Sequence, residues 1–232
     1  MDDRVESSLS MGISTREAAA AAVSGIALLL AAGAAAPVPG GAPDPPEVRV
    51  CWGYGCAERA WVRIPEPDWS AVVALLRPPA PEPAAERRRL RAAIALLDAA
   101  IGRLTPVGQD LAGSQPWGGL PGQQDCIDES LTTEALLQAL ERAGLLQWHR
   151  VIGRVRRAPF GVDVHWTAAI AERTTGRAWA VDPWFGDQGE PAVVQPLADW
   201  LRGAPPPDPP PRRRSRGLAA RLLWSADEDE PF

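Results

Sequence analysis

The sequence contains no lysine, and its 24 basic residues are all arginine, against 29 acidic residues and a net charge of -5. A protein that binds nucleic acid needs a concentrated basic face to neutralise the phosphates. The chain as a whole is acidic and does not indicate such a face. We therefore expect no nucleic-acid partner.

Histidine and cysteine are also scarce, with two histidines and three cysteines in the whole chain. Structural zinc sites take their Cys and His ligands in closely spaced pairs. No pair at a recognised zinc spacing occurs here. We therefore expect no metal site, and we assign no cofactor.

Length and hydrophobic content favour one globular domain, since the chain has 232 residues, 46% of them hydrophobic. The sequence divides into three parts. Residues 1–46 form a leader with a Pro/Gly spacer, residues 47–202 form the folded domain, and residues 203–232 form a tail. The tail begins "GAPPPDPPPRRRSR" and ends with "DEDE", a composition typical of a disordered, solvated segment.

The leader contains an uncharged run, residues 18–38, with "SGIALLLAAGAAA" at its centre. An apolar run that ends in small residues is typical of an export signal, and a membrane anchor is the alternative. Arg4 and Arg16 precede the run, so both interpretations place the remainder outside the cytoplasm. We expect a periplasmic or secreted protein whose contact with a membrane, if it has one, is made by this segment.

The folded part begins with a predicted hairpin, in which "VRVCW" and "AWVRI" alternate in strand fashion around "CWGYGC". A short helix over residues 68–76, capped by Asp68, should follow. The longest helix is predicted from an apolar stripe with helical spacing. The stripe comprises Leu90, Ile94, Leu97, Ile101 and Leu104.

A second long helix is expected to run from Cys126 to Ala143, with Gly144 as its stop. Its inward face should consist of Ile127, Leu131, Leu136 and Leu140. Three strands should follow, over residues 149–157, 163–172 and 177–184, and then a short helix "PLADWL". The fold class is therefore α+β, with the cysteine-bearing helix packed on an antiparallel sheet.

Cys51 and Cys56 flank the glycine-containing turn of the hairpin, and an oxidising compartment favours a disulfide between them. Such a short bridge stabilises a fold by roughly 2 kcal/mol. Cys126 is then left over. A free thiol in an exported protein is either buried as a small hydrophobic side chain or used as a nucleophile.

Cys126 falls at the first residue of its predicted helix, with Asp125 as the cap and Asp128 completing a capping box. The partial positive charge at a helix start favours a thiolate. Asp125, Asp128 and Glu129 oppose it with negative charge. A positively charged imidazole beside the sulfur would be needed to overcome them.

His165 is the better of the two histidines for that role, because it lies on a predicted strand one turn before Asp182. A carboxylate at one ring nitrogen would orient the imidazole and stabilise its charged form. His149, beside Trp148, is expected to be structural or partly exposed. Asp187 is a rival carboxylate, and a buried core role for Cys126 and for His165 remains the alternative.

The fragments "DCIDE", "HWTAAI" and "WAVDPW", in this order, resemble the core of the transglutaminase-like cysteine hydrolase superfamily. "VRVCWGYGCA" and residues 123–201 are similar to a group of poorly characterised exported bacterial proteins of that kind. The resemblance implies a papain-like core, with Cys126 as nucleophile, His165 as base and acid, and Asp182 as orienting carboxylate. The superfamily contains proteases, amidases, acyl-transferring enzymes and inactive members, and a fold alone does not choose among them.

Attack on a carbonyl also needs donors for the oxyanion, and the local candidates are Gln123, Gln124 and the backbone N–H of Cys126. Trp166 and Trp184 are candidates for lining a substrate cleft, and Trp117 and Trp179 lie near the same motifs.

The sequence thus predicts an exported thiol-dependent acyl hydrolase or transferase acting on an amide or ester carbonyl. Peptides or cell-wall-like amides are possible substrates. The alternative is a non-catalytic interaction module that keeps the fold and binds a partner through its tryptophan-rich surface. A redox protein cycling Cys51 and Cys56 is a third hypothesis, although the spacing departs from the two-residue dithiol motif.

Overall fold

A computed structural model of the protein describes residues 42–113, 120–162 and 164–208. The expected export signal, Trp117 and the end of the tail lie outside these residues. Within the described part, no helix combines the length and the apolarity needed to cross a membrane. The elements below all belong to one compact unit of the chain, which begins at Gly40.

Two antiparallel sheets form the β structure, which confirms the α+β class. Strands β1 (Glu47–Trp52) and β2 (Glu58–Arg63) make the expected hairpin. The second sheet is a meander in the order β3-β4-β5-β6. Its strands are β3 (His149–Arg157), β4 (His165–Glu172), β5 (Ala178–Asp182) and β6 (Val193–Pro196). Strand β6, four residues long and paired with β5, was not predicted from the sequence.

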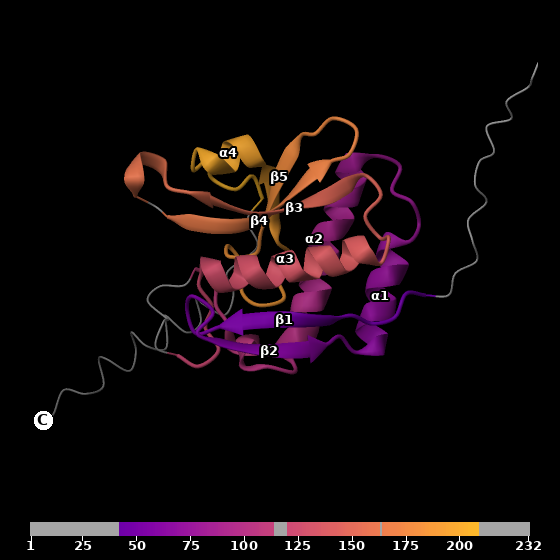
Figure 1. Cartoon of the computed structure of the whole chain (residues 1–232), viewed down its shortest axis with the longest axis horizontal. Helices are drawn as coiled ribbons and strands as arrows, with labels where there is room; N and C mark the ends of the chain where they lie inside the picture. Colours follow the sequence, from indigo (N-terminus) through magenta and orange to yellow (C-terminus); the bar gives the residue numbers. More distant parts are fainter. Residues whose placement is uncertain (1–41, 114–119, 163, 209–232) are drawn as a thin grey trace, which may run out of the picture. The chain divides into compact units, whose positions relative to one another are not determined.

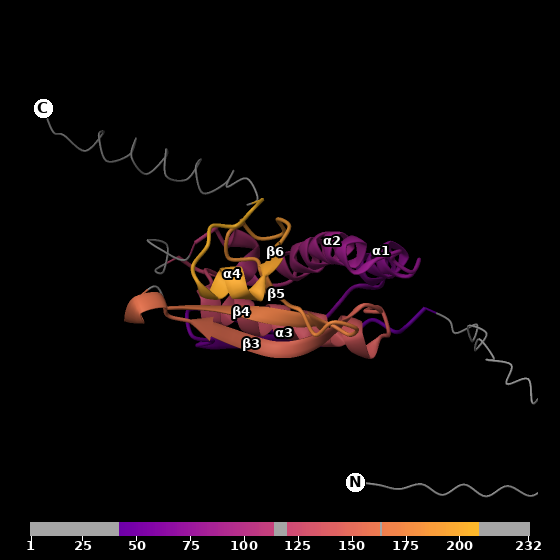
Figure 2. The same ribbon diagram turned by 90° about the horizontal axis from the view of Figure 1, so that it is seen from above.

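Helix α3 (Cys126–Arg142) packs against β1 on one side and against β3, β4 and β5 on the other. Figure 1 shows it between the hairpin and the meander. Helices α1 (Glu66–Leu76) and α2 (Pro83–Gly102) pack on each other, and Figure 2 shows them lying together beside the sheet. The short elements are η1 (Pro106–Gln109), η2 (Pro159–Gly161) and α4 (Leu197–Leu201).

The first two helices differ from expectation at their ends. Helix α1 begins at Glu66 after Pro65, so Asp68 lies in the first turn, where it pairs with Arg103 at 2.6 Å instead of capping. Proline suits a helix start because its missing N–H is not needed there, and the helix therefore begins earlier than predicted. Helix α2 buries its predicted stripe as far as Ile101, but Leu104 lies beyond the helix and is exposed.

Helix α3 buries a polar face in its first two turns, and this corrects the predicted apolar stripe. Leu136 and Leu140 are buried as expected, but Ile127 and Leu131 are only half-buried. The buried side chains of these turns are Asp128, Glu129, Ser130, Thr132 and Thr133. The reason is positional, because this end of the helix meets a polar loop and the candidate site, whereas its other end meets the apolar core.

Candidate active site

Helix α3 begins at Cys126, as its capping sequence predicts. The Asp125 carboxylate accepts from the backbone N–H groups of Ile127 at 3.0 Å and Asp128 at 2.9 Å. The Asp128 carboxylate accepts in turn from the Asp125 N–H at 3.2 Å, which completes the capping box. Among the described residues Cys126 is the free cysteine, and its side chain is half-buried. The sulfur therefore sits at a capped helix start.

The β4–β5 register places His165 and Asp182 on the same face of the sheet. Ala168 pairs with Val181, so continuing the ladder by one residue sets Asp182 opposite Thr167, two residues from His165. Side chains two residues apart on a strand point to the same face, and such diagonal neighbours are within reach of a long side chain. This register therefore lets the two side chains meet.

His165 joins the carboxylate to the thiol. Its Nε2 lies 2.8 Å from Asp182 Oδ2, and the ring also interacts with the Cys126 side chain. Burial by itself would lower the pKa of His165, but the hydrogen bonds to Asp182 and Cys126 and their negative charges outweigh it and raise the pKa to about 9. The imidazole is therefore positively charged at neutral pH. The structure brings the three predicted side chains together.

Trp200, on α4, was missed by the sequence analysis as a member of this site. Its Nε1 donates to Asp182 Oδ2 at 2.8 Å, the oxygen that also faces His165, and its ring lies 5.6 Å from the imidazole. Trp200 is fully buried, so it fixes the carboxylate and shields it from water. The only sequence signal was the final apolar helix "PLADWL", which gives no indication of where its tryptophan points.

Of the two tryptophans proposed to line a cleft, one lies at the site. The Trp184 ring is 4.8 Å from the His165 ring, and Phe185 packs edge-on against Trp184. Trp166 follows His165 on β4, so its side chain points to the opposite face of the sheet. There Trp166 packs under the Arg154 guanidinium at 5.0 Å. Trp184 therefore stays a candidate for contacting substrate, and Trp166 does not share its face.

Gln123 and Gln124 are buried and hold loops. The Gln123 amide donates to the Gln109 carbonyl at 2.7 Å, and the Gln124 amide donates to the Cys51 carbonyl, also at 2.7 Å. The predicted role of both glutamines as oxyanion donors stays a prediction that these contacts do not favour. The backbone N–H of Cys126 has no hydrogen-bond acceptor within the described residues. It stays a candidate donor for an oxyanion.

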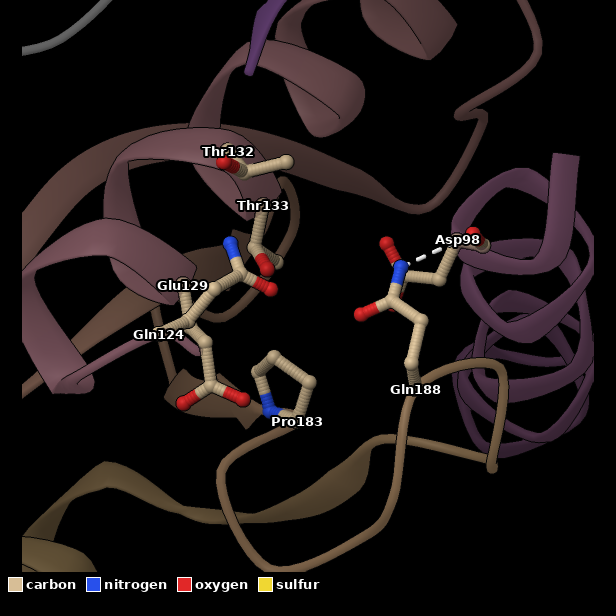
Figure 3. A pocket seen from close by; sticks show the side chains of 7 residues that line it. All are labelled: Asp98, Gln124, Glu129, Thr132, Thr133, Pro183 and Gln188. Atoms are coloured by element: carbon tan, nitrogen blue, oxygen red, sulfur yellow. Dashed lines mark hydrogen bonds between the residues drawn. The ribbon is translucent and has the colours of Figure 1, made fainter. Parts of the chain in front are cut away.

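A small cavity, drawn in Figure 3, has a volume of about 10 Å³, enough for roughly one water molecule. Its lining consists of Asp98, Gln124, Glu129, Thr132, Thr133, Pro183 and Gln188. Oε2 of Glu129 is buried without a hydrogen-bond partner in the described part of the chain. Burial, and then the charge of Asp110, raise the pKa of Glu129 well above its usual range, and burial raises that of Asp98 to about 7. These shifts favour the neutral form of both carboxyl groups.

The rival residues lie elsewhere. Asp187 accepts from the Ala112 backbone N–H at 3.0 Å and so holds a loop. His149 is fully buried, with Nδ1 2.8 Å from Glu86 and Nε2 3.2 Å from the Arg87 guanidinium, which confirms its structural role. No group of three or more Cys, His, Asp or Glu side chains that could hold a metal ion occurs in residues 42–113, 120–162 and 164–208.

The expected bridge between Cys51 and Cys56 is present, with 4.8 Å between the Cα atoms. Comparison with known proteins adds no relative to this picture. No protein-family model matches the chain, and neither a curated protein nor a solved structure matches it.

Proposed function

We propose that this protein is an extracytoplasmic thiol-dependent acyl hydrolase or acyltransferase that attacks an amide or ester carbonyl with Cys126. The observation that carries the proposal is His165, whose ring is hydrogen-bonded to Asp182 at 2.8 Å and also interacts with the Cys126 side chain. A nucleophile, a base and an orienting carboxylate in this connectivity are the requirements of covalent acyl transfer.

The arrangement of the elements supports a transglutaminase-like or papain-like core. The cysteine begins α3, the histidine begins β4 and the aspartate ends β5, and α3 packs on both strands. This order matches the one that the three sequence fragments imply. The resemblance and the geometry thus support the same roles for Cys126, His165 and Asp182.

The proposed reaction has two halves. The Cys126 sulfur bonds to the carbonyl carbon, the carbonyl electron pair moves onto oxygen, and the Cys126 N–H donates to that oxyanion. The intermediate then collapses, the bond to the leaving amine or alcohol breaks, and His165 supplies the proton that this group needs. In the second half His165 removes a proton from water or an acceptor amine, which attacks the thioacyl carbon and releases Cys126.

Extracytoplasmic action rests on the leader of the sequence and is supported by the Cys51–Cys56 bridge, because disulfides persist in oxidising compartments. Peptide or cell-wall-like amides fit such a location as substrates. The Trp184 ring beside His165 provides an aromatic face against which a peptide or sugar could lie.

The test measures how fast iodoacetamide alkylates Cys126 at pH 6. A model thiol is less than about 1% thiolate at this pH, so a charged His165 should make Cys126 at least about tenfold faster. Cys126→Ser should abolish labelling, and His165→Ala should remove the advantage. His149→Gln is the matched control, because His149 touches neither Cys126 nor Asp182, and it should leave the rate unchanged in the folded protein.

A slow thiol that is insensitive to His165→Ala would refute the enzyme and favour the non-catalytic interaction module. If the thiol is fast, labelling with acyl probes of amide and ester type distinguishes the two substrate classes. Release of the probe by added amines, compared with release by water, then separates a transferase from a hydrolase.

A further inference from the structure

The hairpin turn that the disulfide closes lies directly against the start of α3. Residues Gly53, Tyr54, Gly55 and Cys56 all have positive φ, with values of 81°, 70°, 66° and 60°. This left-handed conformation is unfavourable for residues other than glycine, by about 1–2 kcal/mol each, so Tyr54 and Cys56 must be held in it by their surroundings. The turn therefore does not keep this shape for local reasons alone.

The turn is held by the two carboxylates that cap α3. The Tyr54 N–H donates to Asp128 Oδ2 at 2.8 Å, and the Cys56 N–H donates to Asp128 Oδ1. The Gly55 N–H donates to Asp125 Oδ2 at 3.0 Å. Successive backbone N–H groups of a left-handed turn thus converge on one acidic pair, as in the anion-binding concavities that backbone amides form.

Three further hydrogen bonds connect the same loop to the segment around the nucleophile. The Gly53 N–H donates to the Gln123 carbonyl at 3.0 Å, and the Cys51 N–H donates to Thr132 Oγ1 at 3.2 Å. The Gln124 amide donates to the Cys51 carbonyl. The loop from Cys51 to Cys56 is therefore hydrogen-bonded to the chain on both sides of Cys126.

These contacts have an electrostatic consequence for the thiol. Asp125 and Asp128 flank Cys126, and their negative charges oppose a thiolate. Each loop N–H that donates to one of these two carboxylates offsets part of its negative charge. The pKa of Asp128, raised to about 6 by burial and by neighbouring Asp125, leaves it a carboxylate at pH 7, which is the form that accepts these donors. The loop thus makes an acidic capping box compatible with a reactive sulfur.

We propose that the disulfide-closed loop Cys51–Cys56, acting through Asp125 and Asp128, is a positioning element for Cys126, and that the reactivity of Cys126 depends on this loop being closed. The proposal rests on the proposed function, and it assigns to the bridge a role beyond global stability. Without the bridge, the left-handed turn would relax, its N–H groups would leave the carboxylates, and uncompensated negative charge would remain beside the sulfur.

The experiment compares the full chain with the double variant Cys51→Ala/Cys56→Ala, measuring the rate of Cys126 alkylation by iodoacetamide from pH 5 to pH 9. We expect the double variant to react about tenfold more slowly at pH 7, where Asp128 is a carboxylate, with a rate profile displaced to higher pH and with the fold retained by circular dichroism. A merely structural bridge would lower the melting temperature without moving the profile. Ile94→Val, which loosens the buried core away from the loop, is the matched control and should leave the profile in place.

Thr132→Val provides a second variant if the double variant does not fold. Valine has nearly the same shape but no hydroxyl to accept from the Cys51 N–H, so one hydrogen bond between loop and helix is lost while the bridge and the charges of Asp125 and Asp128 remain. We expect a smaller change in the same direction. Unchanged alkylation profiles in both variants, with a fast wild type that His165→Ala slows, would overturn this inference alone. A slow wild type would overturn the proposed function and this inference with it.

Discussion

The two histidines of this chain lie at opposite ends of one strand pair and have different environments. In the β3–β4 ladder His149 pairs with Glu172 at one end, and Arg157 pairs with His165 at the other. Both rings have a carboxylate oxygen at 2.8 Å, Glu86 for His149 and Asp182 for His165. What differs is the third group beside the ring.

At His149 the second nitrogen faces a guanidinium, which can only donate. Nε2 of His149 must therefore accept from Arg87, and Nδ1 must carry the proton that is shared with Glu86. Arg87 is held further by Glu172 at 2.6 Å. Every polar atom of the ring has a partner, and nothing reactive is within reach. This network contributes to stability.

His165 instead has a thiol beside its ring, on a half-buried residue. A thiol can give up its proton to the ring, so the same carboxylate–imidazole pair here supports a charge separation. The comparison shows that a buried histidine with a carboxylate is not by itself a catalytic feature. The third group beside the ring distinguishes a structural pair from one that can support chemistry. At His165 that group is the Cys126 thiol, which is supplied by a different element, α3.

The largest effect is expected from Glu86→Gln. Glu86 is buried and accepts from the backbone N–H groups of Gln147, Trp148 and His149 as well as from the His149 ring. Glutamine would set an NH₂ group against some of these donors, and we expect the free energy of unfolding to fall by about 3–5 kcal/mol. Urea denaturation measures it. Alkylation of Cys126 in the folded protein should be unchanged. Slower alkylation would show that the His149 network also affects the reactivity of Cys126, against the distinction drawn between the two histidines.

The next effect is a dependence of stability on pH at His165. Its pKa is raised in the folded state from 6.5 to about 9, so the charged ring stabilises the fold fully below pH 6.5, and this stabilisation is lost as pH rises through 9. The rise corresponds to about 3 kcal/mol. Denaturation of wild type and His165→Gln between pH 6 and pH 10 should show the loss in the wild type and a flatter curve in the variant. Equal slopes of the free energy of unfolding against pH in the two proteins would contradict a raised pKa of His165 in the folded state.

The smallest effect is expected from Asp182→Asn. His165 and Trp200 both donate to the same oxygen, Oδ2, so an asparagine oxygen in that place can accept both bonds while the negative charge is lost. The imidazolium becomes less favoured, and we expect Cys126 alkylation at pH 6 to slow by about tenfold with little change in stability. Asp182→Asn should thus slow alkylation and leave stability nearly unchanged, whereas Glu86→Gln should lower stability and leave alkylation unchanged. A large loss of stability with normal alkylation in Asp182→Asn would mean that Asp182, like Glu86, has only a structural role.

Much of the site follows from short-range signals. Asp125 and Asp128 around Cys126 form a capping box whatever the helix packs against, because its hydrogen bonds join residues three apart. The bridge between Cys51 and Cys56 likewise closes a turn that its glycines permit. By contrast, the roles of Gln123 and Gln124 were not foreseeable, because their amides reach backbone carbonyls that other segments supply.

The sequence by itself determined that a thiol begins a helix, that a histidine and an aspartate lie on successive strands, and that the chain is α+β, because helix caps, strand alternation and tight turns depend on neighbouring residues. Only the tertiary structure decided that Trp200 holds Asp182, that a left-handed loop donates to the acidic cap, and that burial raises the pKa of Glu129. Those features depend on which distant segments pack together, and the burial that sets their charge states exists only after packing.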